Sequence, residues 1–384
     1  MQNICLLGAS GSVGESTLKV LNIFKNDFSL FSFSVNENIE RAKSIIQEFS
    51  PKYAVVSSEK IDRKILKEKY LSTEILYGKE GLSEIVKQKE VDTVVTAIVG
   101  ASGILPTVEA IKSGKKIAIA NKETLVTFGP YINELLKKYN TSLIPVDSEH
   151  NALFQLLENH SRENIRSITL TASGGSFRNL PIEKLKSVTV EETLNHPTWK
   201  MGAKITVDSA GLINKGLEVI EAHFLFGFPY ENIEVVIHPE SIIHGFMETI
   251  DGSVFGYASE PDMIFPVAHS LFYPKKTPRL LKERKPFTWR VLNFHEPDRS
   301  RYPALDMAYK VGKIGGTAPG IFNAANEEAV SGFLDRKIGF TQIPELIDFA
   351  LNAIPVRNTL ELEEYLDSDR YSREIVRKRI GQGK

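Results

Sequence analysis

The chain has 384 residues, of which 42% are hydrophobic and 25% charged; this is the composition of a folded globular protein and excludes a disordered or fibrous chain. The 47 Lys and Arg nearly balance the 48 Asp and Glu, so the net charge of -1 gives no overall attraction to nucleic acid or an anionic membrane. The single cysteine, Cys5, excludes an intramolecular disulfide and fits a reducing compartment. No apolar run approaches the length of a membrane span, and the first residues do not resemble a signal peptide. We therefore expect a cytoplasmic protein of two or three domains.

The first third of the chain alternates short β-like runs with amphipathic helical stretches. The expected strands are rich in β-branched or aromatic residues and are bounded by Gly, Ser, Asn or Asp. They are Ile4–Leu7, Leu30–Val35, Tyr53–Val56, Thr93–Ile98, Lys116–Ala120 and Ser142–Pro145. Helical periodicity lies between them, at Leu18–Phe24, Ala42–Phe49 and Thr107–Lys112. This alternation predicts a parallel, doubly wound α/β domain.

The middle of the chain predicts an antiparallel or mixed sheet. Its expected strands are Ile168–Ala172, Glu234–His238, Ile242–Thr249 and Ser253–Ala258. The pair Asp251-Gly252 between the last two is a strong hairpin signal. One long helix, from about Ala210 to Phe226, is expected before the last three strands.

The last part of the chain predicts a small helical bundle. The stretch from Pro274 to Pro303 is rich in Pro, Lys and Arg and has weak periodicity, so we expect a linker there. Helical periodicity follows at Ala304–Val311, Asn323–Leu334, Ile343–Leu351 and Glu361–Ile380.

The first chemical motif is the glycine-rich turn Gly8–Gly14, which follows a strand and opens a helix. Its glycines permit a tight turn and let backbone N–H groups approach a phosphate, in a variant of the dinucleotide-binding fingerprint. The alternative is a plain strand-to-helix turn. Glu37, after the second strand, lies near the position from which an acidic residue binds the ribose hydroxyls of NAD. A solvated loop residue is the alternative there.

Two further motifs follow strand ends, where open α/β sheets bind ligands. Lys122 can pair with an anionic or hydroxylated substrate, although its neighbours Asn121 and Glu123 equally suit a helix cap and first turn. Asp147 and Glu149 stand together at a turn and suit one hard cation such as Mg²⁺. The competing interpretation is a helix cap at Asp147 or the next residue.

A polar cluster is expected on the helix after Asp208. Asn214 and Glu218 are four positions apart and Lys215 and Glu218 are three, so the three side chains share one helical face. An amide, an ammonium and a carboxylate together suit a metal-bound polyhydroxy or phosphate ligand. A surface Lys–Glu pair is the alternative, although the opposite face of this helix is apolar.

Two loops have the composition of ligand-binding segments. Thr171–Arg178 offers hydroxyls, backbone N–H groups and an arginine, as a phosphate nest does; the alternative is an ordinary turn. His196–Gly202 combines aromatic, methionine and cationic residues, which is typical of a mobile lid; the alternative is a packed loop anchored by Trp199. His238 and His244 are of a type that more often forms structural hydrogen bonds.

Taken together and in this order, these segments resemble the 1-deoxy-D-xylulose 5-phosphate reductoisomerase family. The resemblance extends to about residue 330, and the last fifty or so residues match only in helical character. The matching segments are Gly8–Gly14, Ala120–Glu123, Pro145–Asn151, Ala172–Arg178, His196–Trp199, Val207–Ala210, Asn214–Glu218, His238–His244, Glu260–Met263 and Asn323–Glu327.

The resemblance implies a three-part α/β protein. The parts are an N-terminal Rossmann-like doubly wound domain (1–147), a central α+β catalytic domain (148–275) with a lid at about 193–203, and a C-terminal helical bundle (303–384) after a linker (276–302). It also implies a homodimer, NADPH and a divalent cation (Mg²⁺, Mn²⁺ or Co²⁺). The implied partner is a small sugar phosphate, with no nucleic acid and no membrane. The implied reaction isomerises 1-deoxy-D-xylulose 5-phosphate and reduces it to 2-C-methyl-D-erythritol 4-phosphate, in the non-mevalonate isoprenoid pathway; retro-aldol and α-ketol routes both fit the sequence.

The resemblance also assigns roles to residues. The family's metal ligands match Asp147, Glu149 and Glu218. Its catalytic residues match Lys122, Glu149, Glu218, His150 and His244. The substrate contacts match Lys122, Ser148, Glu149, Asn214, Lys215 and Glu218, with Ser173, His196 and Ser209 around the phosphate and Trp199 and Met201 in the lid. The expected cofactor contacts are Gly8, Ser10, Gly11, Ser12, Val13, Asn36, Glu37, Asn38, Ala97, Asn121, Glu123, Gly202 and Met263.

The chain departs from the family at Asn36-Glu37-Asn38, where the family has a basic residue flanked by Gly and Asn. Glu37 replaces the cation that faces the 2′-phosphate of NADPH, and its carboxylate should repel that phosphate unless the loop turns it outward. We expect NADPH to be used with a weakened preference over NADH.

Two other functions are compatible with parts of this pattern. A metal-independent NAD(P)-dependent dehydrogenase of a sugar or semialdehyde accounts for the glycine turn, but not for the three carboxylates. A nucleotide-sensing module would bind the cofactor without turnover, and the full set of polar residues argues against it.

Overall fold

The computed structural model describes residues 1–62, 69–199, 201–280 and 289–382. The chain divides into two compact units. The first contains residues 1–124, 132–151 and 262–284, and the second contains residues 125–131, 152–261 and 285–384. Residue 200 of the expected lid and residues 281–288 of the expected linker lie outside the described residues.

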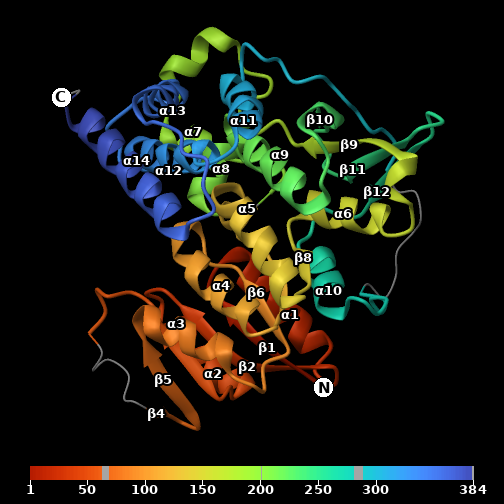
Figure 1. Cartoon of the computed structure of the whole chain (residues 1–384), viewed down its shortest axis with the longest axis vertical. Coiled ribbons are helices and arrows are strands. Elements are labelled where there is room, and N and C mark those ends of the chain that lie inside the picture. The colour runs from red at the N-terminus through yellow and green to blue at the C-terminus, as the bar shows by residue number, and fades with distance from the viewer. Residues whose placement is uncertain (63–68, 200, 281–288, 383–384) are drawn as a thin grey trace. The chain divides into compact units, whose positions relative to one another are not determined.

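The first unit is built on an eight-stranded sheet with the order β4-β5-β3-β2-β1-β6-β7-β8 (Figure 1). All its strand pairs are parallel except β4 with β5. From β1 the chain adds β2 and β3 on one side and β6, β7 and β8 on the other. This is the doubly wound Rossmann order. The strands are β1 (Gln2–Leu7), β2 (Phe28–Val35), β3 (Tyr53–Val56), β4 (Lys69–Tyr70), β5 (Thr73–Tyr77), β6 (Thr93–Thr96), β7 (Lys116–Ile119) and β8 (Leu143–Pro145).

The sequence explains this sheet well. Every residue of β3 and of β6 is buried, as expected for parallel strands covered on both faces. The six strands predicted for this region are confirmed, with ends that differ by at most two residues. The strands β4 and β5 and the helix α3 were not predicted, because charged residues interrupt the apolar pattern there.

Helices of the first unit pack in pairs, α1 with α10 and α3 with α4. They are α1 (Ser12–Ile23), α2 (Ile39–Phe49), α3 (Gly78–Lys87), α4 (Ile104–Lys112), α10 (Ile264–Phe272) and the short helix η1 (Gly100–Gly103). Two more, α5 (Lys122–Tyr139) and α6 (Ser148–Leu157), contribute residues to both units. Within α5 the backbone leaves helical geometry at Phe128, two residues before Pro130, as a proline inside a helix requires.

The second unit contains a four-stranded mixed sheet with the order β10-β9-β11-β12. Strand β10 is parallel to β9, whereas β11 is antiparallel to both β9 and β12. The predicted Asp251-Gly252 hairpin is confirmed between β11 and β12. The strands are β9 (Ile165–Ala172), β10 (Ile233–Ile237), β11 (Ile243–Thr249) and β12 (Val254–Ala258).

The predicted helix from about Ala210 to Phe226 is present, but it begins at Ile213, three residues later than expected. The structure has two helices, α8 (Ala203–Ala210) and α9 (Ile213–Phe226), separated by Gly211 and Leu212. Leu212 has a φ of 51°, a left-handed conformation that no helix continues through. Ser209 of the expected substrate site thus lies on α8, whereas Asn214, Lys215 and Glu218 lie on α9.

The predicted C-terminal helices are all present in the second unit. The last helices of the chain are α11 (Pro303–Ile314), α12 (Ala318–Leu334), α13 (Gln342–Ala353) and α14 (Leu362–Gln382). Before them come α7 (Val190–Leu194) and the short helices η2 (Arg162–Asn164), η3 (Ile182–Ser187) and η4 (Tyr230–Asn232). Helix α12 begins five residues earlier than predicted, because Pro319 is well suited to a helix start.

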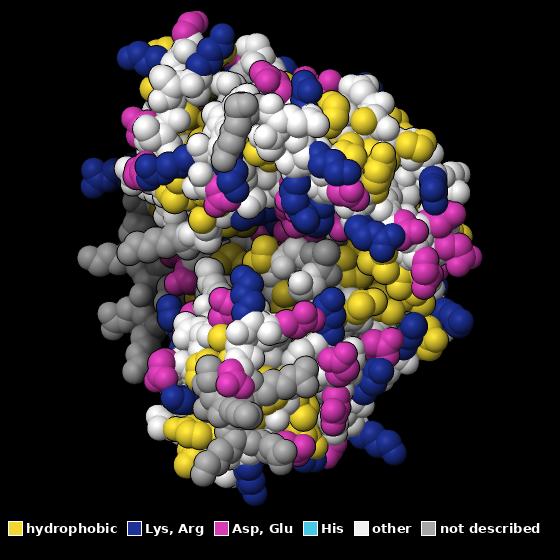
Figure 2. Space-filling view, turned by 90° about the vertical axis from the view of Figure 1, so that its left-hand side faces the viewer, with side chains coloured by type: hydrophobic (Ala, Val, Ile, Leu, Met, Phe, Trp, Pro, Cys, Tyr) yellow, Lys and Arg dark blue, Asp and Glu magenta, His cyan; other side chains and the backbone are white. Residues whose placement is uncertain are grey.

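The surface mixes charges of both signs. On the face shown in Figure 2, basic and acidic side chains are interspersed, in keeping with the near-zero net charge. Within the described ranges, no helix combines the length and the hydropathy needed to cross a membrane.

Candidate active site

The glycine-rich turn lies at the carboxyl end of β1. Gly8 has a φ of 87°, and a Cβ there would lie 2.5 Å from the carbonyl oxygen of Ala97. A Cβ on Gly14 would lie 2.4 Å from the carbonyl oxygen of Gly8. Among the described residues, no side chain caps the first turn of α1, whose N-cap is Gly11. The turn therefore brings backbone N–H groups to a helix start, the arrangement that accepts a phosphate.

The other residues of the expected cofactor loop surround this turn. Ser10 is half-buried, whereas Ser12 is exposed at the first position of α1 and Val13 is half-buried. The backbone N–H of Ala97 bonds to Leu7 at 2.9 Å, which keeps the loop after β6 beside the end of β1. Met263 precedes α10 as its N-cap.

The segment after β2 carries the remaining expected cofactor contacts. Asn38 caps α2, because its side chain accepts a hydrogen bond from the Arg41 backbone N–H at 3.0 Å. The Asn36 side chain accepts a hydrogen bond from the Ser57 hydroxyl at 3.4 Å. Glu37 accepts one from the Ser58 hydroxyl at 2.9 Å. The segment is exposed, but its side chains are linked to the loop after β3.

Asn121 and Lys122 begin α5 and face different partners. The Asn121 side chain caps the helix by accepting a hydrogen bond from the Thr124 N–H, and its amide donates to the carbonyl of Gly100 at 2.9 Å. The Lys122 ammonium lies 2.5 Å from the Asp147 carboxylate, with 7% and 18% of the two side chains exposed. The cap alternative is therefore confirmed for Asn121, while the lysine next to it forms a largely buried ion pair. Glu123 follows in the first turn and is also buried.

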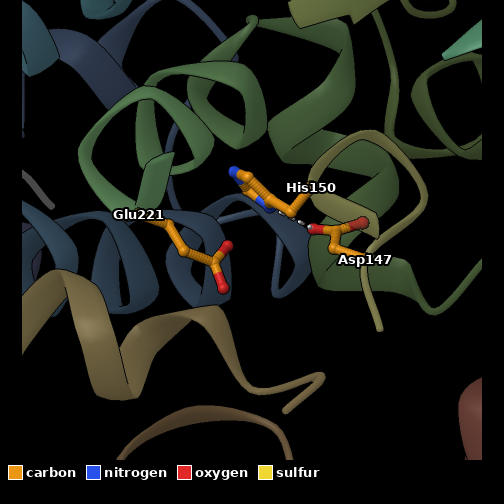
Figure 3. Close-up of side chains that lie close together, drawn as sticks. All are labelled: Asp147, His150 and Glu221. Atoms are coloured by element: carbon orange, nitrogen blue, oxygen red, sulfur yellow. Dashed lines mark ion pairs between the residues drawn. The ribbon is translucent and has the colours of Figure 1, made fainter. Parts of the chain in front are cut away.

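The segment Asp147–Asn151 lies at the carboxyl end of β8. The Asp147 carboxylate accepts a hydrogen bond from the Ser148 N–H at 3.1 Å, and its carbonyl accepts one from Asn151 at 2.8 Å, so Asp147 also begins α6. The Ser148 hydroxyl donates to the Glu149 carboxylate. Fully buried His150 has its Nδ1 atom 4.0 Å from the Asp147 carboxylate (Figure 3). One turn thus gathers two carboxylates, a hydroxyl and an imidazole.

In the second unit, the predicted polar face of α9 is confirmed. The Glu218 carboxylate accepts hydrogen bonds from the Asn214 amide and the Lys215 ammonium. Lys215 and Glu218 are 3% and 1% exposed, so this pair is not the surface pair that the spacing alone would allow. Glu221, labelled in Figure 3, is a second buried carboxylate on the same helix. Burying such charges is unfavourable unless they are paired, and it is common at functional sites.

A second polar group of this unit gathers around His196. Its Nε2 atom lies 3.0 Å from the Ser173 hydroxyl and 3.4 Å from the Ser209 hydroxyl. Its Nδ1 atom accepts hydrogen bonds from the backbone N–H groups of Thr198 and Trp199, at 3.1 and 2.9 Å. Because Nδ1 is an acceptor, the ring proton is on Nε2, the atom that faces the two serines.

The surroundings of His196 keep its imidazole neutral. Burial and the Arg178 guanidinium lower the pKa of His196 to about 4. Arg178 also donates to the carbonyl of Ser173 at 3.1 Å. A Cβ on Gly175 would lie 2.4 Å from the carbonyl oxygen of Ser209, so only glycine permits the loop to approach α8 this closely. Two hydroxyls, an N–H donor and a guanidinium therefore meet in one place, which suits a phosphate.

The expected lid is continuous with this group. His196 ties the backbone of Trp199, whose ring lies 6.4 Å from the imidazole of His244. The His244 ring is 4% exposed and interacts through Nε2 with Ser259, and burial lowers its pKa to about 4. Met201 is half-buried, and Gly202 is exposed as the N-cap of α8.

Sequence reasoning missed several residues near these groups. Ser58 and Lys60 contact Glu37. They could have been expected there, because β2 and β3 are adjacent and parallel and the loops that follow them lie at the same edge of the sheet. Buried Asp208 on α8 interacts with Lys204 and with Asn326 of α12. No local sequence pattern predicts the contact between Asp208 and Asn326, because the two residues are 118 positions apart.

Comparison with known proteins identifies one family over nearly the whole chain, so the expectation that the resemblance ends near residue 330 is wrong. Residues 4–129 match the model of 1-deoxy-D-xylulose 5-phosphate reductoisomerase, and residues 143–226 and 258–375 match two models of its C-terminal domain. The reductoisomerase of Leptospira biflexa serovar Patoc is 60% identical over 100% of this chain and 99% of the relative. That of Pelodictyon phaeoclathratiforme is 47% identical over 99% of this chain and 100% of the relative.

Solved structures agree with this match. The reductoisomerase of Zymomonas mobilis in complex with NADPH has a TM-score of 0.91 and 36% identity, over 99% of both chains. A reductoisomerase in complex with NADPH, fosmidomycin and magnesium has a TM-score of 0.93 and 35% identity, over 99% of this chain and 98% of that one.

Proposed function

The chain belongs to the 1-deoxy-D-xylulose 5-phosphate reductoisomerase family, and we propose that it carries out the family's reaction. It isomerises 1-deoxy-D-xylulose 5-phosphate and reduces the product to 2-C-methyl-D-erythritol 4-phosphate, with NADPH and a divalent cation, as an enzyme of the non-mevalonate isoprenoid pathway. The observation that carries the proposal is the pair of buried lysine–carboxylate groups, Lys122 with Asp147 and Lys215 with Glu218. A metal-independent dehydrogenase has no use for them, and the family match disfavours it.

We propose Asp147, Glu149 and Glu218 as the ligands of the cation. All three offer carboxylate oxygens, the donors that Mg²⁺ and Mn²⁺ prefer, and each already accepts hydrogen bonds or an ion pair that fixes its orientation. When bound, the cation polarises the substrate carbonyl as a Lewis acid.

The residues around these carboxylates hold the substrate. Lys122 and Lys215 stabilise negative charge on the substrate oxygens electrostatically. Ser148 and Asn214 donate hydrogen bonds to hydroxyl and carbonyl groups of the substrate. His150 and His244 complete the proposed catalytic set.

The group around His196 binds the substrate phosphate. Ser173 and Ser209 donate through their hydroxyls and His196 through Nε2–H, since its Nδ1 is already used by the lid backbone. Binding at His196 therefore positions Trp199, and with Met201 this residue excludes water from the reacting carbons.

The glycine turn and its neighbours bind NADPH. The close approach of Gly8 to Ala97 and of Gly14 to Gly8 leaves room for a pyrophosphate where side chains would otherwise lie. The remaining proposed contacts are Ser10, Gly11, Ser12, Val13, Asn36, Glu37, Asn38, Asn121, Glu123, Gly202 and Met263.

The assembly and the compartment are also proposals. Edge strand β12 exposes Val254 and Phe255, and a groove on the same sheet is lined by Phe246, Val254 and Phe294. An edge strand that exposes apolar side chains supports a homodimer. The single, buried Cys5 supports a reducing cytoplasm. For the functional division we keep residues 1–147, 148–275, the linker 276–302 and 303–384.

The direct test follows NADPH oxidation with 1-deoxy-D-xylulose 5-phosphate, first with Mn²⁺, then after EDTA, with NADH in parallel. We expect oxidation that depends on the metal and is restored when Mn²⁺ is added back. A folded chain that oxidises neither cofactor, or that is indifferent to EDTA, would contradict the proposal.

A further inference from the structure

The carboxyl ends of β2 and β3 bring two loops together at one edge of the sheet. The strands are adjacent and parallel, and Val35 at the end of β2 pairs with Val56 at the end of β3. Glu37 follows the first strand and Lys60 the second. The glycine turn after β1 lies at the same edge, because β1 is parallel to β2 and next to it. The carboxyl edge is where an open α/β sheet binds a dinucleotide.

The two loops hold Glu37 in one orientation. The Ser58 hydroxyl donates to its carboxylate at 2.9 Å, and the backbone N–H of Ser58 bonds to the carbonyl of Asn36 at 3.3 Å. The Lys60 ammonium lies 3.8 Å from the same carboxylate oxygen. The Lys60 backbone N–H bonds to the Ser58 hydroxyl at 3.2 Å, which ties the lysine to the same turn. The carboxylate therefore has a cation beside it.

A second cation, Arg41, is close in sequence but is differently engaged. Its guanidinium donates to both oxygens of Glu15, each at 2.7 Å, and to the Ser44 hydroxyl at 2.9 Å. Such a bidentate pair has fixed geometry and is among the stronger ion pairs. The Lys60 side chain is 86% exposed, and an exposed lysine pair is weak and easily rearranged. Lys60 can thus turn to a new anion at lower cost than Arg41.

Resting on the NADPH-dependent function proposed above, we propose that Lys60 supplies the positive charge for the 2′-phosphate of NADPH. It replaces the cation that is absent at position 37. Glu37, oriented by Ser58, is the hydrogen-bond acceptor for the ribose hydroxyls of NADH. A phosphate monoester carries nearly two negative charges at neutral pH, so beside Glu37 it needs a neighbouring cation. The preference for NADPH over NADH therefore depends on Lys60.

Equilibrium binding tests this without turnover. Dissociation constants for NADPH, NADH, 2′,5′-ADP and 5′-AMP are measured by calorimetry for the full chain and for Lys60→Ala. We expect Lys60→Ala to weaken NADPH and 2′,5′-ADP about 10-fold, the equivalent of one charge-assisted contact, and to change NADH and 5′-AMP less than about 2-fold. Glu37→Gln should weaken NADH and leave NADPH the same or tighter.

The matched control is Lys52→Ala. Lys52 also pairs with a glutamate, Glu90 at 3.0 Å, but it precedes β3 and so lies at the opposite edge of the same sheet. The Lys52→Ala variant removes the same charge and should leave all four dissociation constants unchanged.

Three outcomes overturn the assignment of Lys60. Lys60→Ala binds NADPH as tightly as the unaltered chain, or it weakens NADPH and NADH equally, or Arg41→Ala alone removes the preference. In each case the unaltered chain still binds NADPH, so the proposed function stands. An unaltered chain that binds neither dinucleotide overturns both proposals.

Discussion

The carboxyl edge of the eight-stranded sheet and the helices α8 and α9 build polar sites from different materials. At the sheet edge, backbone shapes the site: Gly8 and Gly14 permit close approaches, and Asn38 and Asn121 cap the helices that begin there. On α9, buried side chains shape it, through hydrogen bonds from a lysine and an amide to Glu218. Substitutions of these glycines should therefore act through sterics, and substitutions on the polar face of α9 through charge.

The largest effect is expected at Glu218. Replacing Glu218 by Gln removes a proposed metal ligand and the carboxylate that pairs with Lys215, so kcat/KM should fall on the order of 10³-fold. The Mn²⁺ concentration at half-maximal rate should rise as well. Steady-state assays over a Mn²⁺ series measure both. The control is Glu231→Gln, in the same unit, where the glutamate forms an exposed pair with Lys313. Retention of more than a tenth of the activity would contradict the assigned role.

Next in size is a steric effect at the glycine turn. Gly14→Ala forces a Cβ to within 2.4 Å of a backbone oxygen, and should lower the unfolding free energy by about 3 kcal/mol and weaken NADPH binding. Gly11→Ala is the matched control for stability, because its Cβ would lie 3.5 Å from the nearest atom, the Gly8 carbonyl oxygen. Urea denaturation compares the two. Equal loss in both variants would mean that close approach is not what requires Gly14.

These two regions differ in how far they could be predicted. Strand β1, which precedes the glycine turn, and strand β3 could be predicted from short β-branched runs with clear boundaries. Strand β3 is observed at Tyr53–Val56, as predicted. The break at Leu212 was missed, because the apolar periodicity of the helix continues through it. Spacing placed Asn214, Lys215 and Glu218 on one face, but only packing shows that the face is buried.

Contacts between distant segments were beyond sequence reasoning. His196 meets Ser173 across 23 positions, and Ser58 meets Glu37 across 21. Neither pair has a periodic signal, since loops set these distances and their conformations depend on the whole fold. The family resemblance assigned His196 and Ser173 to the phosphate site. It did not indicate that the His196 imidazole also accepts hydrogen bonds from the backbone of the lid.

A smaller effect is expected where α12 supports α8. Asn326 donates to the Asp208 carboxylate at 2.9 Å, and both residues are fully buried. Asn326→Ala should cost about 2 kcal/mol in unfolding free energy, because Asp208 loses a buried partner. Since Ser209 is next to Asp208, KM should rise more than kcat falls. Asn352→Ala, at an exposed position of α13, is the control and should be nearly neutral. A change in kcat alone would argue against this support of the phosphate group.

Three buried histidines should make the stability of the folded chain depend on pH. Burial lowers the pKa of His196, His244 and His269 to about 4, below the ordinary 6.5. The unfolded chain therefore takes up these protons first, so stability is full above about pH 7 and is lost as the pH falls from 6.5 towards 4. Denaturation midpoints at pH 7.5, 6 and 5 measure the loss. His244→Gln should flatten the curve, and an unchanged slope in this variant would refute the contribution of His244.

The smallest effect is expected at an exposed ion pair of the C-terminal helices. Arg377 pairs with Glu328 at 2.7 Å but is 62% exposed, so Arg377→Ala should change the unfolding free energy by less than about 0.5 kcal/mol. Arg373, which is 16% exposed and pairs with Glu327 and Asp369, should matter more. Thermal melting of both variants decides whether burial makes this difference.

The tautomer of His196 has a consequence for how substrate affinity varies with pH. A ring that stays neutral from pH 5 to 9 donates the same single proton throughout, and so do the serine hydroxyls beside it. We therefore expect changes in affinity near neutrality to follow the ligand, whose phosphate loses its second proton at about pH 6. The affinity of the group around His196 thus depends on the ionisation state of the phosphate that it binds. Analogues whose second proton leaves at higher pH should bind in proportion to their dianionic fraction.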